Sequence, residues 1–127
     1  MRVLALDYGS ARCGCALSDP TGQLATPIES ILEPASDRGL EAIARLVQER
    51  GVEEVVVGLP VSLSGEEGSQ AAEARAFAAQ LAERLTVPVR TFDERYTTAL
   101  ARRTPGRLPE DSRAAAHLLD TYLAARR

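Results

Sequence analysis

Acidic residues stand at three places in this sequence where carboxylates could do chemistry. Asp7 closes an apolar run, Asp93 and Glu94 follow a second apolar run, and Asp111 lies near the start of the last alanine-rich segment. Carboxylates that converge repel one another unless a cation lies between them, and oxygen ligands select hard cations such as Mg²⁺ or Mn²⁺. Two such ions, about 3.5–4 Å apart, suit the hydrolysis of phosphodiester bonds.

Each of these acids also has a purely structural explanation. Asp7 could stabilise a turn at Gly9, because Asp is a favoured turn residue. An acid beside an apolar run costs desolvation, however, which favours a function for Asp7. Asp93 and Glu94 could cap a following helix, and Asp111 could complement a helix dipole, an effect of about 0.3–1 kcal/mol. On the residues alone, the roles of Asp93 and Asp111 stay open between structure and chemistry.

The remaining reactive residue types favour structural roles. His117 is the only histidine and lies in an apolar helical pattern, so a packing or surface role is expected. Asp120, further along the same pattern, is expected to be a solvated charge. Cys13 and Cys15 are separated by one glycine, a spacing that suits neither a CxxC redox pair nor zinc ligands. On a strand both would lie on one face, as small buried thiols in a reducing compartment.

Apolar runs and helical patterns alternate along the chain and predict an α/β domain with a mixed sheet covered by helices. Three short strands, at residues 2–7, 13–18 and 23–31, indicate an antiparallel meander. Further strands are predicted at 54–59 and 87–92. The predicted helices are 37–50, a long one that follows 65–67 and reaches about residue 85, 97–103 and 110–125. Ligands gather at the carboxyl ends of parallel strands, so the acids are expected to converge at one end of the sheet.

Length, composition and charge limit the class of protein. The chain has 127 residues, 45% of them hydrophobic, which fits one domain over 1–127. No segment approaches the roughly 18 apolar residues of a membrane span, and no signal peptide is recognised, so we expect a cytoplasmic protein with no membrane partner. The net charge of −3 argues against nucleic-acid binding by bulk electrostatics alone. From Arg90 onward, eight arginines against five acids could form a local phosphate-binding patch.

Four stretches, taken in order, carry a resemblance to a known family. They are "LALDYGSARCGCALSD", "VVVGLPVSLSGEEGS", "TFDERYTTALA" and "EDSRAAAHLLDTYL", and the resemblance covers almost the whole chain. Together they resemble the YqgF/RuvX family, whose members have an RNase H-like fold. The first and third stretches are the most specific, because an Asp-x-Gly turn followed by Arg12 is joined by Glu94-Arg95 and a Thr-Thr pair. The resemblance implies a five-stranded sheet, with an antiparallel meander and parallel strands, flanked by helices.

The resemblance also implies an activity and a set of site residues. It implies a metal-dependent nuclease of the bacterial cytoplasm that matures the 5′ end of pre-16S rRNA in ribosome biogenesis. Asp7 matches the family's first-strand metal ligand, Glu94 the acid of its Asp-Glu-Arg-x-Thr-Thr motif, and Asp111 the acid of its Asp-x-x-Ala-Ala helix. These three acids are thus the predicted catalytic ligands of Mg²⁺ or Mn²⁺, in a site of two ions. Arg12 and Arg95 match basic positions that meet the phosphates of the substrate.

Some features depart from the family, and other functions stay open. The connection between Thr98 and Asp111 is short and carries "RRTPGRLP", and Arg113 replaces a residue that is more often apolar. A Holliday junction resolvase acting on branched DNA, or an RNA-binding module without catalysis, would fit the same motifs. An ATPase of the actin and sugar-kinase type would need a second phosphate loop, for which the chain is too short. Trimming an RNA end needs only a monomer, whereas junction resolution favours a two-fold homodimer.

Overall fold

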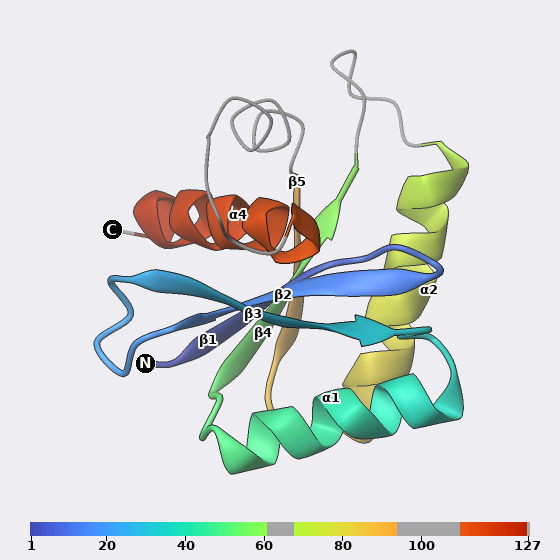
Figure 1. Cartoon of the computed structure of the whole chain (residues 1–127), viewed down its shortest axis with the longest axis horizontal. Helices are drawn as coiled ribbons and strands as arrows, with labels where there is room; N and C mark the ends of the chain where they lie inside the picture. Colours follow the sequence, from blue (N-terminus) through green and yellow to red (C-terminus); the bar gives the residue numbers. More distant parts are fainter. Residues whose placement is uncertain (61–67, 94–109, 127) are drawn as a thin grey trace.

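Five strands form one mixed sheet in the order β3-β2-β1-β4-β5 (Figure 1). The computed structural model describes residues 1–60, 68–93 and 110–126. The predicted mixed sheet is confirmed, while the helix predicted at 97–103 lies outside the described residues. The strands are β1 (Val3–Asp7), β2 (Arg12–Ser18), β3 (Ala25–Leu32), β4 (Glu54–Leu59) and β5 (Val89–Asp93), and the helices are α1 (Asp37–Glu49), α2 (Ser69–Arg84) and α4 (Glu110–Arg126).

The first three strands form the predicted antiparallel meander. β3 begins at Ala25, two residues later than the sequence pattern indicates, because the Asp19 side chain holds the preceding residues in a turn. Asp19 Oδ1 accepts hydrogen bonds from the backbone N–H groups of Gln23 and Leu24, at 2.8 and 2.9 Å. These two N–H groups are therefore not available to a strand ladder.

The other half of the sheet is parallel, since β4 pairs with β1 and β5 pairs with β4 in the same direction. Helices α1 and α2 make the crossovers. The side chain of Ser36 caps α1 by accepting a hydrogen bond from Gly39 N–H at 3.0 Å, and Gly51, with φ of 63°, follows the end of the helix. β5 begins at Val89 rather than at residue 87, directly after Pro88, which has no N–H to give to a ladder.

Helix α4 lies on one face of the sheet, and α1 and α2 lie on the other (Figure 1). The central strand β1 supplies alternate side chains to both faces. Leu4 and Leu6 pack in the core with α1 and α2, whereas Val3 and Ala5 pack in the core with α4. A strand buried on both faces explains why its sequence is a continuous apolar run up to its last residue.

Two further expectations are tested by this arrangement. Cys13 and Cys15 are fully buried in the core shared with α1 and α2, and both are free thiols, as the spacing predicted. Within residues 1–60, 68–93 and 110–126, no helix combines the length and the apolar character needed to cross a membrane.

Candidate active site

Asp7 is the last residue of β1 and lies half-buried at the edge of the sheet where the parallel strands end. Strand alternation assigns it to a face. Val3 and Ala5, four and two residues earlier, pack against α4, so the Asp7 position belongs to the α4 face. Its partner across the β1–β2 ladder is Gly14, which has no side chain to cover it. The apolar strand therefore places one carboxylate, at its end, on the side of the sheet that α4 covers.

The first turn of α4 is tied to the same corner of the sheet by Ser112. This side chain is fully buried. Its Oγ accepts a hydrogen bond from the N–H of Cys15 at 3.3 Å and donates one to the carbonyl of Ile28 at 2.5 Å. Cys15 follows directly after Gly14, the ladder partner of Asp7. The backbone of Asp111, one residue before Ser112, is thus in the turn that lies next to this ladder, while its side chain is outside the described part of the structure.

The end of β5 reaches the same edge of the sheet. In the parallel ladders Leu6 pairs with Val57 and Val57 with Thr91, so the ends of β1 and β5 are level and two strands apart. That separation is about 10 Å, since neighbouring strands lie about 4.8 Å apart. Glu94 follows directly after β5 in the sequence, and both Glu94 and Arg95 lie outside the described residues.

The bond from Cys15 to Ser112 places the start of α4 beside the β2 residue that follows the ladder partner of Asp7, while the grouping of the three predicted acids stays untested. Among the residues that the structure describes, no group of three His, Cys, Asp or Glu side chains is close enough to hold a metal ion. Only Asp7 of the three predicted ligands has a described side chain. The metal site formed by Asp7, Glu94 and Asp111 remains a prediction.

A cavity of about 290 Å³ opens at this edge, between the β1–β2 turn and the start of α2. The ring of Tyr8 forms one part of it and packs on Phe77 at 4.7 Å between ring centroids. Burial, followed by the charges of Glu73 and Cys13, raises the pKa of Tyr8 above its ordinary value of 10.0. The cavity is lined by Asp7, Tyr8, Gly9, Ser10, Pro60, Gln70 and Glu73.

Glu73 and Gln70 are members of this cavity that the sequence alone did not single out. They lie one helical turn apart near the beginning of α2, in a segment read as an ordinary alanine-rich helix. They line the same cavity as Asp7 because of the crossover that carries the chain from β4 to β5. No local sequence signal encodes that proximity, and only the order of the strands could have indicated it.

Arg12, the predicted phosphate-binding residue, begins β2 and is exposed. It follows the β1–β2 turn, in which the backbone comes very close to itself. A Cβ on Gly9 would lie 2.6 Å from the carbonyl oxygen of Arg12, so only glycine fits there. This turn keeps the exposed guanidinium of Arg12 at the same edge of the sheet as Asp7.

The other polar residues considered from the sequence lie apart from a shared site. His117 is half-buried on α4, in keeping with a packing or surface role, and Asp120 is exposed as predicted. Asp93 is half-buried at the end of β5. Alternation from Phe92, which packs with α4, assigns Asp93 to the opposite face from Asp7.

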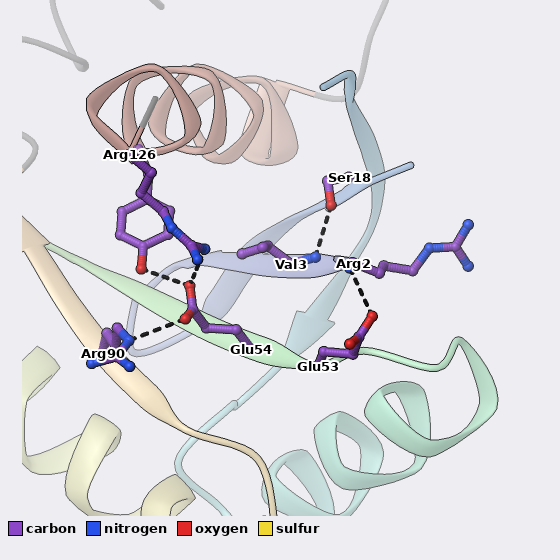
Figure 2. A network of polar contacts seen from close by, with 8 residues as sticks. Arg2, Val3, Ser18, Glu53, Glu54, Arg90 and Arg126 are labelled. Atoms are coloured by element: carbon purple, nitrogen blue, oxygen red, sulfur yellow. Dashed lines mark hydrogen bonds and ion pairs between the residues drawn. The ribbon is translucent and has the colours of Figure 1, made fainter. Parts of the chain in front are cut away.

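The largest described charge network lies at the other end of the central strands, around the buried Glu54 (Figure 2). Its Oε1 accepts hydrogen bonds from Tyr122 at 2.6 Å and from Arg126 at 2.7 Å, and its Oε2 accepts one from Arg90 at 3.1 Å. Burial, then the hydrogen bond to Glu54 and its charge, raises the pKa of Tyr122 to about 12. Every oxygen of this carboxylate has a partner, so the network fastens α4 to β4 and β5.

The order of the strands, the change from antiparallel to parallel pairing and the acid at the end of the central strand define an RNase H-like domain of the kind found in nucleases. Solved structures agree with this fold. A RuvC of T. thermophilus in complex with a Holliday junction substrate matches 99% of this chain and 96% of its own, with a TM-score of 0.65 and 17% identity. The Holliday junction resolvase of fowlpox virus matches 100% of both chains, with a TM-score of 0.59 and 11% identity.

The chain belongs to the RuvX family, described as a Holliday junction resolvase family, whose model matches residues 1–125. A relative from Chloroflexus aurantiacus named as a pre-16S rRNA nuclease is 43% identical over 134 residues, covering 98% of this chain and 88% of its own length. A relative of the same name from Thermobifida fusca is 56% identical over 99 residues, covering 77% of this chain and 61% of its own. The family resemblance seen in the sequence motifs is thus confirmed, and the family is one of phosphodiester hydrolases.

Proposed function

We propose that this chain is a divalent-metal-dependent nuclease that hydrolyses phosphodiester bonds during maturation of the 5′ end of pre-16S rRNA in the bacterial cytoplasm. The observation that carries the proposal is the corner of the sheet where Asp7 ends β1 on the α4 face and Ser112 fastens the first turn of α4 beside it. Membership of the RuvX family and the names of the relatives support the same activity.

The predicted set of ligands fits a hard divalent cation. Asp7, Glu94 and Asp111 would hold Mg²⁺ or Mn²⁺ through carboxylate oxygens, the donors these ions prefer. When bound, two such ions supply charge neutralisation on the scissile phosphate and activation of the attacking water. The carboxylate of Asp7 fits this role because it lies half-buried where the apolar strand ends, opposite a glycine in the β1–β2 ladder.

The arginines would bind and orient the RNA. Arg12 is exposed at the site's edge, and Arg95 is adjacent in sequence to Glu94. A guanidinium offers a fork of N–H donors that matches two phosphate oxygens, which makes arginine suited to the backbone of either RNA or DNA. With a net charge of −3 the whole molecule does not attract nucleic acid by its overall charge, so these local contacts must hold the substrate.

Resolution of Holliday junctions is the second candidate, because the family model carries that description. It requires two active sites related by a two-fold axis, and therefore a homodimer. End maturation of an RNA requires one site, so a monomer suffices. The oligomeric state of the active species separates these two functions.

The test offers three substrates to the purified protein with Mg²⁺ or Mn²⁺: a pre-16S 5′-leader RNA, a generic single-stranded RNA and a four-way DNA junction. We expect preferential cleavage of the leader RNA and a loss of at least about a hundredfold in rate for Asp7→Asn. Asp120→Asn, which removes an exposed acid of α4, is the matched control and should cleave normally.

Each other outcome has a defined meaning. Preferential cleavage of the junction would replace RNA maturation by junction resolution. Cleavage by Asp7→Asn at the rate of the unaltered protein would refute the assignment of Asp7 to the metal site. RNA binding that is unaffected by Asp7→Asn, with no cleavage of any substrate, would identify a binding module.

A further inference from the structure

The hydroxyl of Ser112 occupies an unusual place, between opposing residues of two neighbouring strands. Cys15 and Ile28 are partners in the β2–β3 ladder, and the ladder has a register irregularity between Cys13 and Cys15. Ser112 Oγ accepts from the N–H of Cys15 and donates to the carbonyl of Ile28. One side chain from α4 thus bridges a backbone donor and a backbone acceptor at the point where the two strands lose register.

This bridge fixes the beginning of α4 in three dimensions. Ser112 is fully buried, so neither backbone group would find water if the hydroxyl were removed. The far end of α4 is held separately, by the bonds of Tyr122 and Arg126 to Glu54 (Figure 2). The two attachments are at opposite ends of the helix, and only the Ser112 attachment lies beside the ladder partner of Asp7.

We infer that Ser112 is a positioning residue of the nuclease site, which sets the backbone of Asp111 in register with Asp7 by clamping the first turn of α4 to β2 and β3. This inference rests on the proposed function, because it takes Asp111 as a metal ligand. Ser112 contacts neither metal nor substrate; it acts through its neighbour in the sequence. Removing a group that orients a metal ligand without contacting the metal typically lowers the metal affinity about 10- to 100-fold.

The test measures Mn²⁺ binding to the full chain without substrate, by calorimetry, for Ser112→Ala and for Tyr122→Phe. Both changes delete one hydroxyl of α4 that is hydrogen-bonded to the sheet, so both should destabilise the fold. We expect the Mn²⁺ affinity to fall about tenfold or more in Ser112→Ala and to stay unchanged in Tyr122→Phe. In the background of Asp111→Asn, Ser112→Ala should cause no further loss, because the two residues act as one unit.

The results that overturn the inference are distinct from those that overturn the proposed function. Wild-type Mn²⁺ affinity in Ser112→Ala, an equal loss in Tyr122→Phe, or additive losses with Asp111→Asn would each refute the positioning role. If Asp7→Asn binds Mn²⁺ as tightly as the unaltered protein, the proposed site itself fails. Should Ser112→Ala not fold, Ser112→Cys, which is slightly larger and keeps a weak donor, is expected to fold with an intermediate Mn²⁺ affinity, and unchanged affinity would refute the role.

Discussion

Asp7 and Glu54 both border the apolar cores of the central strands, but their surroundings differ. Glu54 is buried at the start of β4, and three donors from Tyr122, Arg90 and Arg126 surround its two oxygens. A buried carboxylate satisfied in this way is a structural anchor. Asp7 lies half-buried at the open edge of the sheet, beside a cavity of about 290 Å³. Glu54 therefore holds the fold together, whereas the half-buried place of Asp7 beside the cavity is consistent with the proposed role as a metal ligand.

Asp19 gives a prediction about stability in acid. Hydrogen bonds from the backbone of Leu24, the hydroxyl of Thr21 and the backbone of Gln23 hold the pKa of Asp19 well below its ordinary value of 3.8. A depressed pKa in the folded state means that the ionised form contributes stability above the ordinary value, and that this contribution is lost as the pH falls toward the folded value. We expect the free energy of unfolding to fall less between about pH 5 and about pH 2 in Asp19→Asn than in the unaltered protein.

Urea denaturation across this pH range checks the Asp19 prediction. Glu41→Gln, which removes an exposed acid of α1, is the control for the loss of one negative charge. The variant Asp19→Asn should also be less stable than the unaltered protein at neutral pH, where the charge of Asp19 is fully formed. Parallel acid profiles for the two proteins would contradict the prediction.

At the scale of elements, α4 is the helix that joins the candidate site to the rest of the domain. It packs across β1, β2 and β3, and its two ends are fastened by different chemistry. The beginning depends on one neutral hydroxyl in a strand ladder, and the end depends on a buried carboxylate with two arginines and a tyrosine. The two ends of α4 are therefore held to the sheet independently of each other.

The attachment at the end of α4 predicts a dependence of stability on alkaline pH. The pKa of Tyr122 is raised to about 12, first by burial and then by Glu54, so its neutral form stabilises the folded state. That contribution is complete below the ordinary value of 10.0 and is lost as the pH rises to about 12. Tyr122→Phe should lower the free energy of unfolding by about 1–3 kcal/mol at neutral pH and should flatten its decline above pH 10.0.

Chemical unfolding at neutral and alkaline pH measures both parts of the Tyr122 prediction. Thr121→Val is the control, because the hydroxyl of Thr121 only donates to the carbonyl of His117 within the same helix. This control should leave stability nearly unchanged. If Tyr122→Phe loses stability above pH 10.0 as steeply as the unaltered protein, the alkaline dependence has another source.

The elements and the fold class could be predicted from the sequence because they depend on local patterns. Alternation, apolar runs and helix stops predicted the described strands and helices to within two residues. The two largest differences, at the starts of β3 and β5, have local causes in Asp19 and Pro88. The partners of Glu54 could not be predicted, because Arg90, Tyr122 and Arg126 reach it from other elements. The same is true of Ser112, whose partners in β2 and β3 are 97 and 84 residues away.

The sequence marks only some of the residues around the candidate site, for a related physical reason. The sequence marks Asp7 because an acid at the end of an apolar strand costs desolvation free energy unless a partner or a bound ligand compensates it. Nothing local marks Glu73 or Gln70, which face the same cavity only because α2 follows β4. Site membership depends on the crossing of strands and helices, whereas an unfavourable residue in a regular element is visible in the sequence itself.

At the scale of the whole molecule, the central strands unite the two cores. Leu81 of α2 is fully buried in the core on one face, and Leu119 of α4 is fully buried in the core on the other. β1 supplies alternate residues to both cores. Loss of packing on either face therefore exposes apolar side chains of this shared strand. The candidate site lies at the end of this strand and therefore shares the stability of both cores.

This arrangement predicts that the domain unfolds in a single cooperative transition. Leu81→Ala and Leu119→Ala remove equal volumes from opposite faces, and each should lower the free energy of unfolding by about 2–5 kcal/mol. Leu24→Ala, at a side chain that is 70% exposed, is the control and should have little effect. Circular dichroism should show one transition in every variant, and hydrogen exchange should show α1 and α4 losing protection together. Loss of α4 protection in Leu119→Ala, with α1 still protected, would mean that the two faces unfold independently and that the site can come apart while half of the fold persists.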